Sequence, residues 1–167
     1  MKKIYLVIGL ISSLTISSCN KQKVCSTGYT GSDCSVQTTP TKIIVSKIEV
    51  SKFPSTDTGG AGWDLTSGAD IYPVLTKGSN TIWESPTYST DANPNSSYTY
   101  TLSPSADIIS PFETYSISLY DYDDLDSDDF MGGINFVPYS TTNKFPSVIN
   151  VDAGGSVSFK LHLTYVF

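Results

Sequence analysis

The apolar and polar residues from Lys42 onward follow the two-residue period of β-strands. Apolar side chains stand at every second position from Val157 to Tyr165, with polar residues between them, which predicts a strand with one buried face. Turn-forming residues recur roughly every eight to twelve positions, and no long segment has the apolar spacing of a helix. The pattern predicts an all-β fold, an eight-stranded antiparallel β-sandwich. Its strands are expected at 43–53, 70–77, 81–88, 97–103, 113–121, 130–139, 146–151 and 156–166.

The N-terminal sequence, MKKIYLVIGLISSLTISSCN, has the plan of a targeting segment. Two Lys residues precede an apolar run, residues 4–14, that is too short to span a bilayer comfortably. The Ile-Ser-Ser-Cys sequence that ends at Cys19 resembles the lipobox of bacterial lipoprotein signal peptides. This resemblance implies removal of residues 1–18 and lipidation of Cys19, palmitate included, which anchors the protein without a spanning helix. The alternatives are an ordinary signal peptide and a buried N-terminal helix.

Residues 25–34, CSTGYTGSDC, resemble the last disulfide loop of an EGF-like module. With Cys19 assigned to lipid, Cys25 and Cys34 remain as a pair, in keeping with export to an oxidising compartment. We expect a bridge between them, which stabilises the short loop by about 2–3 kcal/mol. Residues 19–41 then comprise the lipidated Cys, the stapled loop and a polar linker, and serve either as a spacer above the membrane or as a binding element.

The charge of the chain excludes some partners. The sequence has no Arg, and removal of Lys2 and Lys3 would leave 8 Lys against 16 acidic residues, a net charge of −8. Binding to nucleic acid needs clustered cations, so nucleic acid is excluded as a partner, and an anionic membrane surface is disfavoured. The lipid anchor places the expected location in the bacterial cell envelope, at the outer membrane.

Acidic residues are concentrated in one short stretch. Six of the nine residues from Asp121 to Asp129 are Asp, and such mutual repulsion is offset either by solvent or by a bound cation. Asp121, Asp123 and Asp129 form the pattern D-x-D-x5-D between two predicted strands. Upstream, Asp64 and Asp70 stand six residues apart, just before a predicted strand.

These two Asp spacings resemble the third and first calcium-binding loops of C2 domains. An Asn-Pro turn at 93–94 and the strand after it resemble the segment between those loops, so the resemblance covers residues 42–167. It implies a C2-like sandwich with calcium (Ca2+) as its cofactor. Only one strand precedes the first loop, which fits the circularly permuted variant of the fold.

The resemblance also implies a role for each ligand. Asp64 and Asp121 would bridge adjacent ions, and Asp70, Asp123, Asp129 and the Tyr122 carbonyl would complete the sites. Calcium prefers six to eight oxygen ligands at about 2.3–2.6 Å, more than one loop supplies, so two loops at one end of a sandwich are needed.

Two other interpretations of the acidic stretch remain. It could be a solvated loop, as runs of like charge usually are. It could also be an EF-hand, because Asp124, Asp126 and Asp128 fit the first ligand positions. Asp129 and Asn135 then stand where that motif requires Gly and Glu, which argues against it.

No enzyme motif is found. His162 is the single His and falls on the polar face of the last predicted strand, no thiol is left unassigned, and no Gly-rich phosphate loop follows a strand. The expected function is that of a lipid-anchored envelope protein with a calcium-dependent binding module for phospholipid membrane, glycan or protein. The alternative is a calcium-stabilised structural or adhesion subunit with no lipid binding. Leu65 and Leu125, at the loop tips, are candidate membrane contacts, although no Lys accompanies them.

Overall fold

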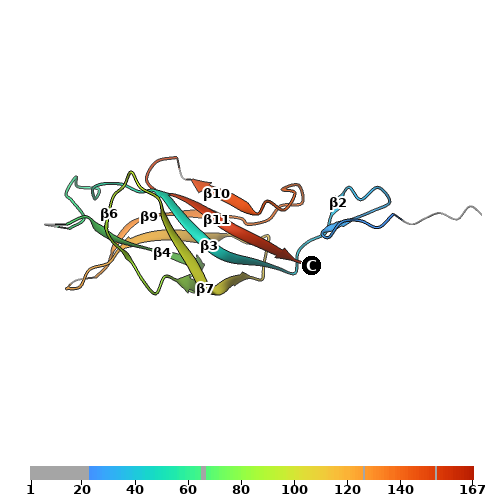
Figure 1. The fold of residues 1–167 in the computed structure, drawn as a ribbon, viewed down its shortest axis with the longest axis horizontal. Helices are drawn as coiled ribbons and strands as arrows, with labels where there is room; N and C mark the ends of the chain where they lie inside the picture. Colours follow the sequence, from blue (N-terminus) through green and yellow to red (C-terminus); the bar gives the residue numbers. More distant parts are fainter. Residues whose placement is uncertain (1–22, 65–66, 126, 153) are drawn as a thin grey trace, which may run out of the picture.

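The computed structural model describes residues 23–64, 67–125, 127–152 and 154–167, and these form strands and loops. Two antiparallel sheets pack face to face (Figure 1). The first has the order β10 (Val148–Asp152), β11 (Ser158–Val166), β3 (Lys42–Lys52) and β7 (Tyr98–Ile108). The second has the order β5 (Asn80–Glu84), β4 (Ala69–Lys77), β8 (Tyr115–Asp121) and β9 (Asp129–Phe136), with β6 (Ser89–Ala92) also paired to β4. The predicted all-β antiparallel sandwich is confirmed.

The alternation of apolar residues explains which face of each strand is buried. In β11, Phe159, Leu161 and Leu163 are buried and the residues between them are more exposed, as the sequence predicts. In the other sheet, strand β8 buries Tyr115, Ile117 and Leu119 in the same way. Burial of each such side chain stabilises the fold by about 1.5–3 kcal/mol. The core therefore lies between the inner faces of the two sheets.

Within the residues that the structure describes, the sandwich has nine strands where eight are predicted, because the strand expected at 81–88 is interrupted. β5 ends at Glu84, and Pro86, which has no N–H to donate, follows in a turn. The Ser85 hydroxyl donates to the carbonyl oxygen of Thr87 at 2.6 Å and closes that turn. The chain then re-enters the sheet as β6, where a loop was expected.

The first and last strands of the sandwich are neighbours. β3 and β11 pair along almost their whole lengths, from Lys42 opposite Val166 to Lys52 opposite Ser158. The two ends of the sandwich domain therefore lie side by side, as a circularly permuted arrangement requires.

The N-terminal segment forms a small hairpin of β1 (Tyr29–Thr30) and β2 (Val36–Gln37). The predicted bridge between Cys25 and Cys34 is present, with the two Cα atoms 5.2 Å apart. The hairpin lies beside the C-terminus, at the end of the sandwich where β3 begins (Figure 1). Among the residues that the structure describes, no helix has the length and hydropathy needed to cross a bilayer.

Candidate metal centre

The antiparallel pairing of β4 with β8 brings the two Asp-bearing loops to one end of the sandwich. Asp70 is the second residue of β4 and Asp121 the last residue of β8, and Ile71 is paired directly with Asp121. The backbone N–H of Tyr122 donates to the carbonyl oxygen of Asp70 at 2.9 Å, which ties the start of one loop to the end of the other. Asp129 opens β9 and is paired with Asp121. The predicted convergence of the two loops is present.

Asp121 is the buried member of the set, with no exposed surface. It continues the inward-facing series of Tyr115, Ile117 and Leu119, so the strand period itself directs this carboxylate into the interior. Its Oδ1 accepts a hydrogen bond from the backbone N–H of Asp70 at 2.5 Å. Within the described part of the chain, its buried Oδ2 has no hydrogen-bond partner. A buried, unpaired carboxylate oxygen is costly and needs an explanation, such as a bound ion.

The electrostatics around Asp121 disfavour its charged form. Its pKa is raised to about 6, chiefly by burial and then by the neighbouring carboxylates Asp64, Asp123 and Asp70, against the lowering effect of the backbone hydrogen bond from Asp70. Like charges that crowd a buried group act in this direction, and a cation at the same place would reverse it. The site therefore has an excess of negative charge in the absence of a cation.

The acidic side chains surround a cavity of about 290 Å³. Asp64, Asp70 and Asp123 are half-buried and line it, and Leu125 stands fully exposed at its edge. Asp129 is exposed, and neither it nor the buried Asp121, its partner across the sheet, is among the residues that line this cavity. The full lining is Asp64, Ser67, Asp70, Tyr122, Asp123, Asp124 and Leu125.

Two further acidic residues, to which the C2 resemblance assigns no role, organise these loops. The Asp128 carboxylate accepts from the Tyr72 hydroxyl at 2.5 Å and from the backbone N–H of Asp123 at 3.2 Å. Asp91 donates its backbone N–H to the Asp70 carboxylate at 2.9 Å. The contacts of Asp128 with Tyr72 and of Asp91 with Asp70 join residues far apart in sequence, and the C2 spacing assigns no role to Asp128.

The described residues contain no group of three His, Cys, Asp or Glu side chains already arranged to hold a metal ion. The chemistry of the donors, all of them carboxylates, nevertheless suits calcium, and the unpaired oxygen of Asp121 lies among them. The ligand set thus stays a prediction. Leu65, Cys19 and the predicted signal peptide lie outside the described residues.

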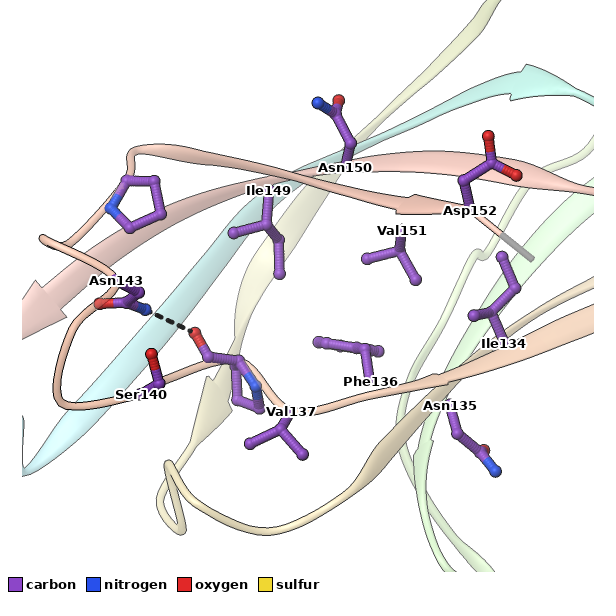
Figure 2. Close-up of a pocket in the computed structure, with 12 residues that line it drawn as sticks. Ile134, Asn135, Phe136, Val137, Ser140, Asn143, Ile149, Asn150, Val151 and Asp152 are labelled. Atoms are coloured by element: carbon purple, nitrogen blue, oxygen red, sulfur yellow. Dashed lines mark hydrogen bonds between the residues drawn. The ribbon is translucent and has the colours of Figure 1, made fainter. Parts of the chain in front are cut away.

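A separate concavity of about 370 Å³ lies between the edge strands β9 and β10 (Figure 2). Ile134, Phe136, Ile149 and Val151 extend into it, while Asn and Ser side chains stand near its rim. None of the predicted calcium ligands lines this concavity. It is a gap between two sheet edges, distinct from the metal centre.

His162 forms part of a surface ion network. Its Nε2 lies 2.8 Å from Oε1 of Glu49, and the Lys47 ammonium lies 2.7 Å from the same oxygen. Hydrogen bonds from Lys47 and His162 lower the pKa of the Glu49 carboxyl. The expected position of His162 on the outer face of the last strand agrees with these contacts, since β11 and β3 pair through His162 and Lys47.

Comparison with known proteins identifies the fold. No protein-family model and no curated protein matches the chain. Among solved structures, the chain is similar to a C2 domain at 13% identity and a TM-score of 0.50, covering 75% of this chain and 98% of that one. It is also similar to a C2 domain of plant extended synaptotagmin 1 (12% identity, TM-score 0.47, covering 77% of this chain and 97% of that one). A third match, a pair of C2 domains from extended synaptotagmin 2, has 16% identity and a TM-score of 0.47, and covers 97% of this chain and 49% of that one. The first match and the two-sheet topology together show that the sandwich formed by β3 to β11 has the C2 fold.

Proposed function

We propose that this chain is a lipid-anchored, calcium-binding module of the bacterial cell envelope that binds phospholipid headgroups through its acidic loop end. The observation that carries the calcium proposal is Asp121, whose fully buried carboxylate has an oxygen without a partner in the described residues. The carboxylates of Asp64, Asp70 and Asp123 add negative charge around it. A cation bound among them would offset all these charges together.

The residues that would hold calcium are the predicted ones. Asp64, Asp70 and Asp123 line one cavity and act electrostatically on the buried Asp121, and the Tyr122 carbonyl and Asp129 complete the set that the C2 resemblance implies. Bound calcium supplies positive charge, which offsets the repulsion within the loops and attracts phosphate. Because no three acidic groups are at metal-binding spacing among the described residues, binding requires the two loops to draw together.

The choice of a phospholipid ligand rests on Leu125. This side chain is fully exposed at the edge of the acidic cavity, where its transfer into a bilayer would contribute about 1.5–3 kcal/mol. The absence of any Lys among the residues that line the cavity favours the alternative, in which calcium only stabilises the loops of a structural subunit.

Calorimetry of the mature chain, residues 19–167 with Cys19→Ser to keep it soluble, tests calcium binding. Asp121→Asn should weaken calcium affinity much more than Asp124→Asn, which removes the same charge from an exposed position to which the C2 resemblance assigns no ligand. Equal losses, or no calcium heat at all, would leave the stretch as a solvated loop.

Co-sedimentation with phospholipid vesicles separates the two functions. Calcium should bring the soluble chain down with the vesicles, and Leu125→Ala should reduce the bound fraction without changing the calcium heat. Calcium binding with no sedimentation would favour the structural alternative.

A further inference from the structure

The disulfide-closed segment and the residues after it, 25–41, here called the stalk, pack against the sandwich. Gly28 is buried, and a Cβ atom added to it would lie 2.6 Å from Cζ of Phe167 and 2.8 Å from Cε2 of Phe145. The Tyr29 ring meets the Phe145 ring edge-on, with centroids 5.4 Å apart. The stalk backbone therefore lies directly on two aromatic rings of the domain.

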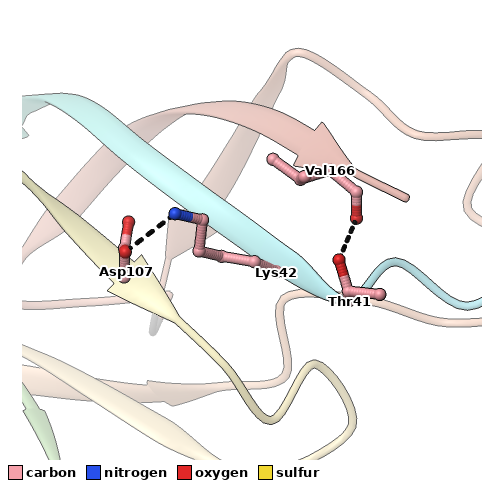
Figure 3. Close-up of polar contacts among 4 residues, drawn as sticks. All are labelled: Thr41, Lys42, Asp107 and Val166. Atoms are coloured by element: carbon pink, nitrogen blue, oxygen red, sulfur yellow. Dashed lines mark hydrogen bonds and ion pairs between the residues drawn. The ribbon is translucent and has the colours of Figure 1, made fainter.

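Hydrogen bonds fix the rest of the stalk. The Gln37 side chain accepts from the backbone N–H of Lys144 at 2.6 Å and donates to the carbonyl oxygen of Ser140 at 3.3 Å. The Tyr139 hydroxyl donates to the carbonyl oxygen of Thr38 at 3.2 Å. Where the stalk ends, the Thr41 hydroxyl and backbone N–H both donate to the Val166 carbonyl oxygen, at 3.1 and 2.7 Å (Figure 3). The segment expected to be a polar linker is thus attached at several points.

The loop that contains Lys144 and Phe145 contacts the stalk, and its backbone has an unusual conformation there. Lys144 and Phe145 have φ angles of +58° and +53°, a left-handed conformation that residues other than Gly rarely adopt. This conformation presents the Lys144 N–H to Gln37 and places the Phe145 ring among those of Tyr29, Tyr139, Tyr165 and Phe167. Strain of this kind persists only where the surrounding contacts hold it.

The stalk and the acidic loops lie at opposite ends of the sandwich (Figure 1). β3 begins at Lys42, directly after the stalk, and ends at Lys52, toward the loop end. Its 11 residues extend about 33 Å at 3.3 Å per residue. The loops are therefore separated from the stalk by at least the length of this strand.

The tether to a lipid on Cys19 is shorter than that separation. Five residues lie between Cys19 and Cys25, and the six Cα–Cα steps span about 20 Å at full extension. Inserting Leu125 into the anchoring membrane would require the domain to invert and raise its stalk end by about 33 Å. An undocked segment from Cys19 to Thr41, shortened by the bridge whose Cα atoms lie 5.2 Å apart, would still span roughly 50 Å and permit this, so the docking of the stalk decides the outcome.

We propose that the docked stalk directs the calcium loops away from the membrane that carries the anchor, so that they bind a second phospholipid surface opposite it. This inference rests on the proposed function. The docking gives the molecule a fixed polarity, with its anchor at one end and its binding loops at the other.

Energy transfer from Trp63 to a dansyl lipid tests this polarity. Trp63 is adjacent to Asp64, and its Nε1 donates to the carbonyl oxygen of Pro54 at 2.8 Å. Trp83→Phe removes the other Trp, and Cys19, the one Cys outside the bridge, couples the mature chain to a maleimide lipid in phospholipid vesicles. Dansyl lipid in these vesicles reports approach to the chain's own membrane, and dansyl lipid in separate vesicles reports binding to a second membrane.

Calcium should produce several-fold more transfer to the separate vesicles than to the chain's own. An insertion of about 20 Gly and Ser residues before Cys25, roughly 70 Å when extended, should raise the own-membrane signal several-fold. Gly28→Ala should also raise it by displacing the stalk. Its matched control is Gly31→Ala, because Gly31 has a similar φ of +91° and its Cβ would meet only stalk atoms, at 3.5 Å or more.

The failure of each idea has its own signature. Strong energy transfer from Trp63 to dansyl lipid in the chain's own vesicles, with the native tether and with or without calcium, would overturn the proposed orientation of the loops away from the anchoring membrane. Without calcium, energy transfer to dansyl lipid in the chain's own vesicles should be weak and should rise when the Gly and Ser residues are inserted before Cys25. That result would support the proposed orientation of the loops even if no second membrane is bound. No calcium heat and no sedimentation of the soluble chain would overturn the proposed function instead.

Discussion

At the scale of single residues, the period of β8 places a carboxylate where an apolar side chain would otherwise stand. Asp121 follows Tyr115, Ile117 and Leu119 on the buried face, and its neighbours on both loops are also acidic. The Asp70 N–H is its one hydrogen-bond donor among the described residues. The domain without calcium therefore contains a destabilised group at its proposed binding site, and its stability should depend on pH.

The first prediction concerns this pH dependence. Asp121 has a pKa of about 6 in the fold against an ordinary value of 3.8, so the folded state favours its protonated form. Its favourable contribution is complete below about pH 4 and is lost as the pH rises through 6. The loss corresponds to about 1–3 kcal/mol. Urea unfolding of the mature chain in a chelator from pH 4 to pH 7 measures it.

The control is Asp121→Asn, which can still accept from the Asp70 N–H but cannot ionise. At pH 7 without calcium this variant should be more stable than the natural sequence by about 1–3 kcal/mol. It should also lose the decline between pH 4 and pH 7. If the two proteins decline in parallel, other carboxylates are responsible.

At the scale of elements, long alternating runs are what the sequence predicts well. β8 and β11 agree with their expected ranges to within two residues, because one face of each is buried throughout. The interruption occurs at Pro86, which cannot donate a hydrogen bond to a neighbouring strand although the residues before it favour a strand. The docking of the stalk depends on Phe145, more than one hundred residues away from Tyr29, which no local pattern reveals.

The candidate site likewise has a part that the sequence predicts and a part that it does not. The spacings of Asp64 with Asp70, and of Asp121 with Asp123, could be recognised because pairing of β4 with β8 brings such loops together. The contacts of Asp91 and Asp128, and the exposure of Asp129, depend on loop conformations that spacing does not determine.

A second prediction concerns the bridge. Cys25→Ser with Cys34→Ser removes the restraint on the stalk, so the stalk should undock while the sandwich stays folded, since its core lies between the sheets. Hydrogen exchange measures this directly. The Lys144 amide, which donates to Gln37, should exchange faster, and the amides of β8 should be unaffected. Unchanged protection at Lys144 would mean that the aromatic contacts hold the stalk without the bridge.

At the scale of the whole molecule, charge is unevenly distributed. The chain carries a net charge of −6, and the Asp-rich stretch provides six of its 16 acidic residues. Repulsion within this end of the sandwich opposes a compact loop structure. A divalent cation that binds only the folded loops should therefore stabilise the entire domain.

A third prediction follows for thermal unfolding. Calcium at 100 times its dissociation constant should stabilise the domain by about 2.7 kcal/mol per independent site. Magnesium should stabilise it much less, because it requires a tighter shell and gives up water reluctantly. Scanning calorimetry of the mature Cys19→Ser chain with each ion measures both effects, and equal shifts with the two ions would contradict a calcium-selective site.

The central position of β3 has a mechanical consequence. This strand follows directly from the stalk and is paired on both sides, with β11 and with β7. A pull between the anchor and a partner held by the loops would load β3 along its length, in shear against two ladders of hydrogen bonds at once. Those bonds would have to break together and not one after another. A molecule that connects two surfaces would thus carry tension through a strand that is held on both sides.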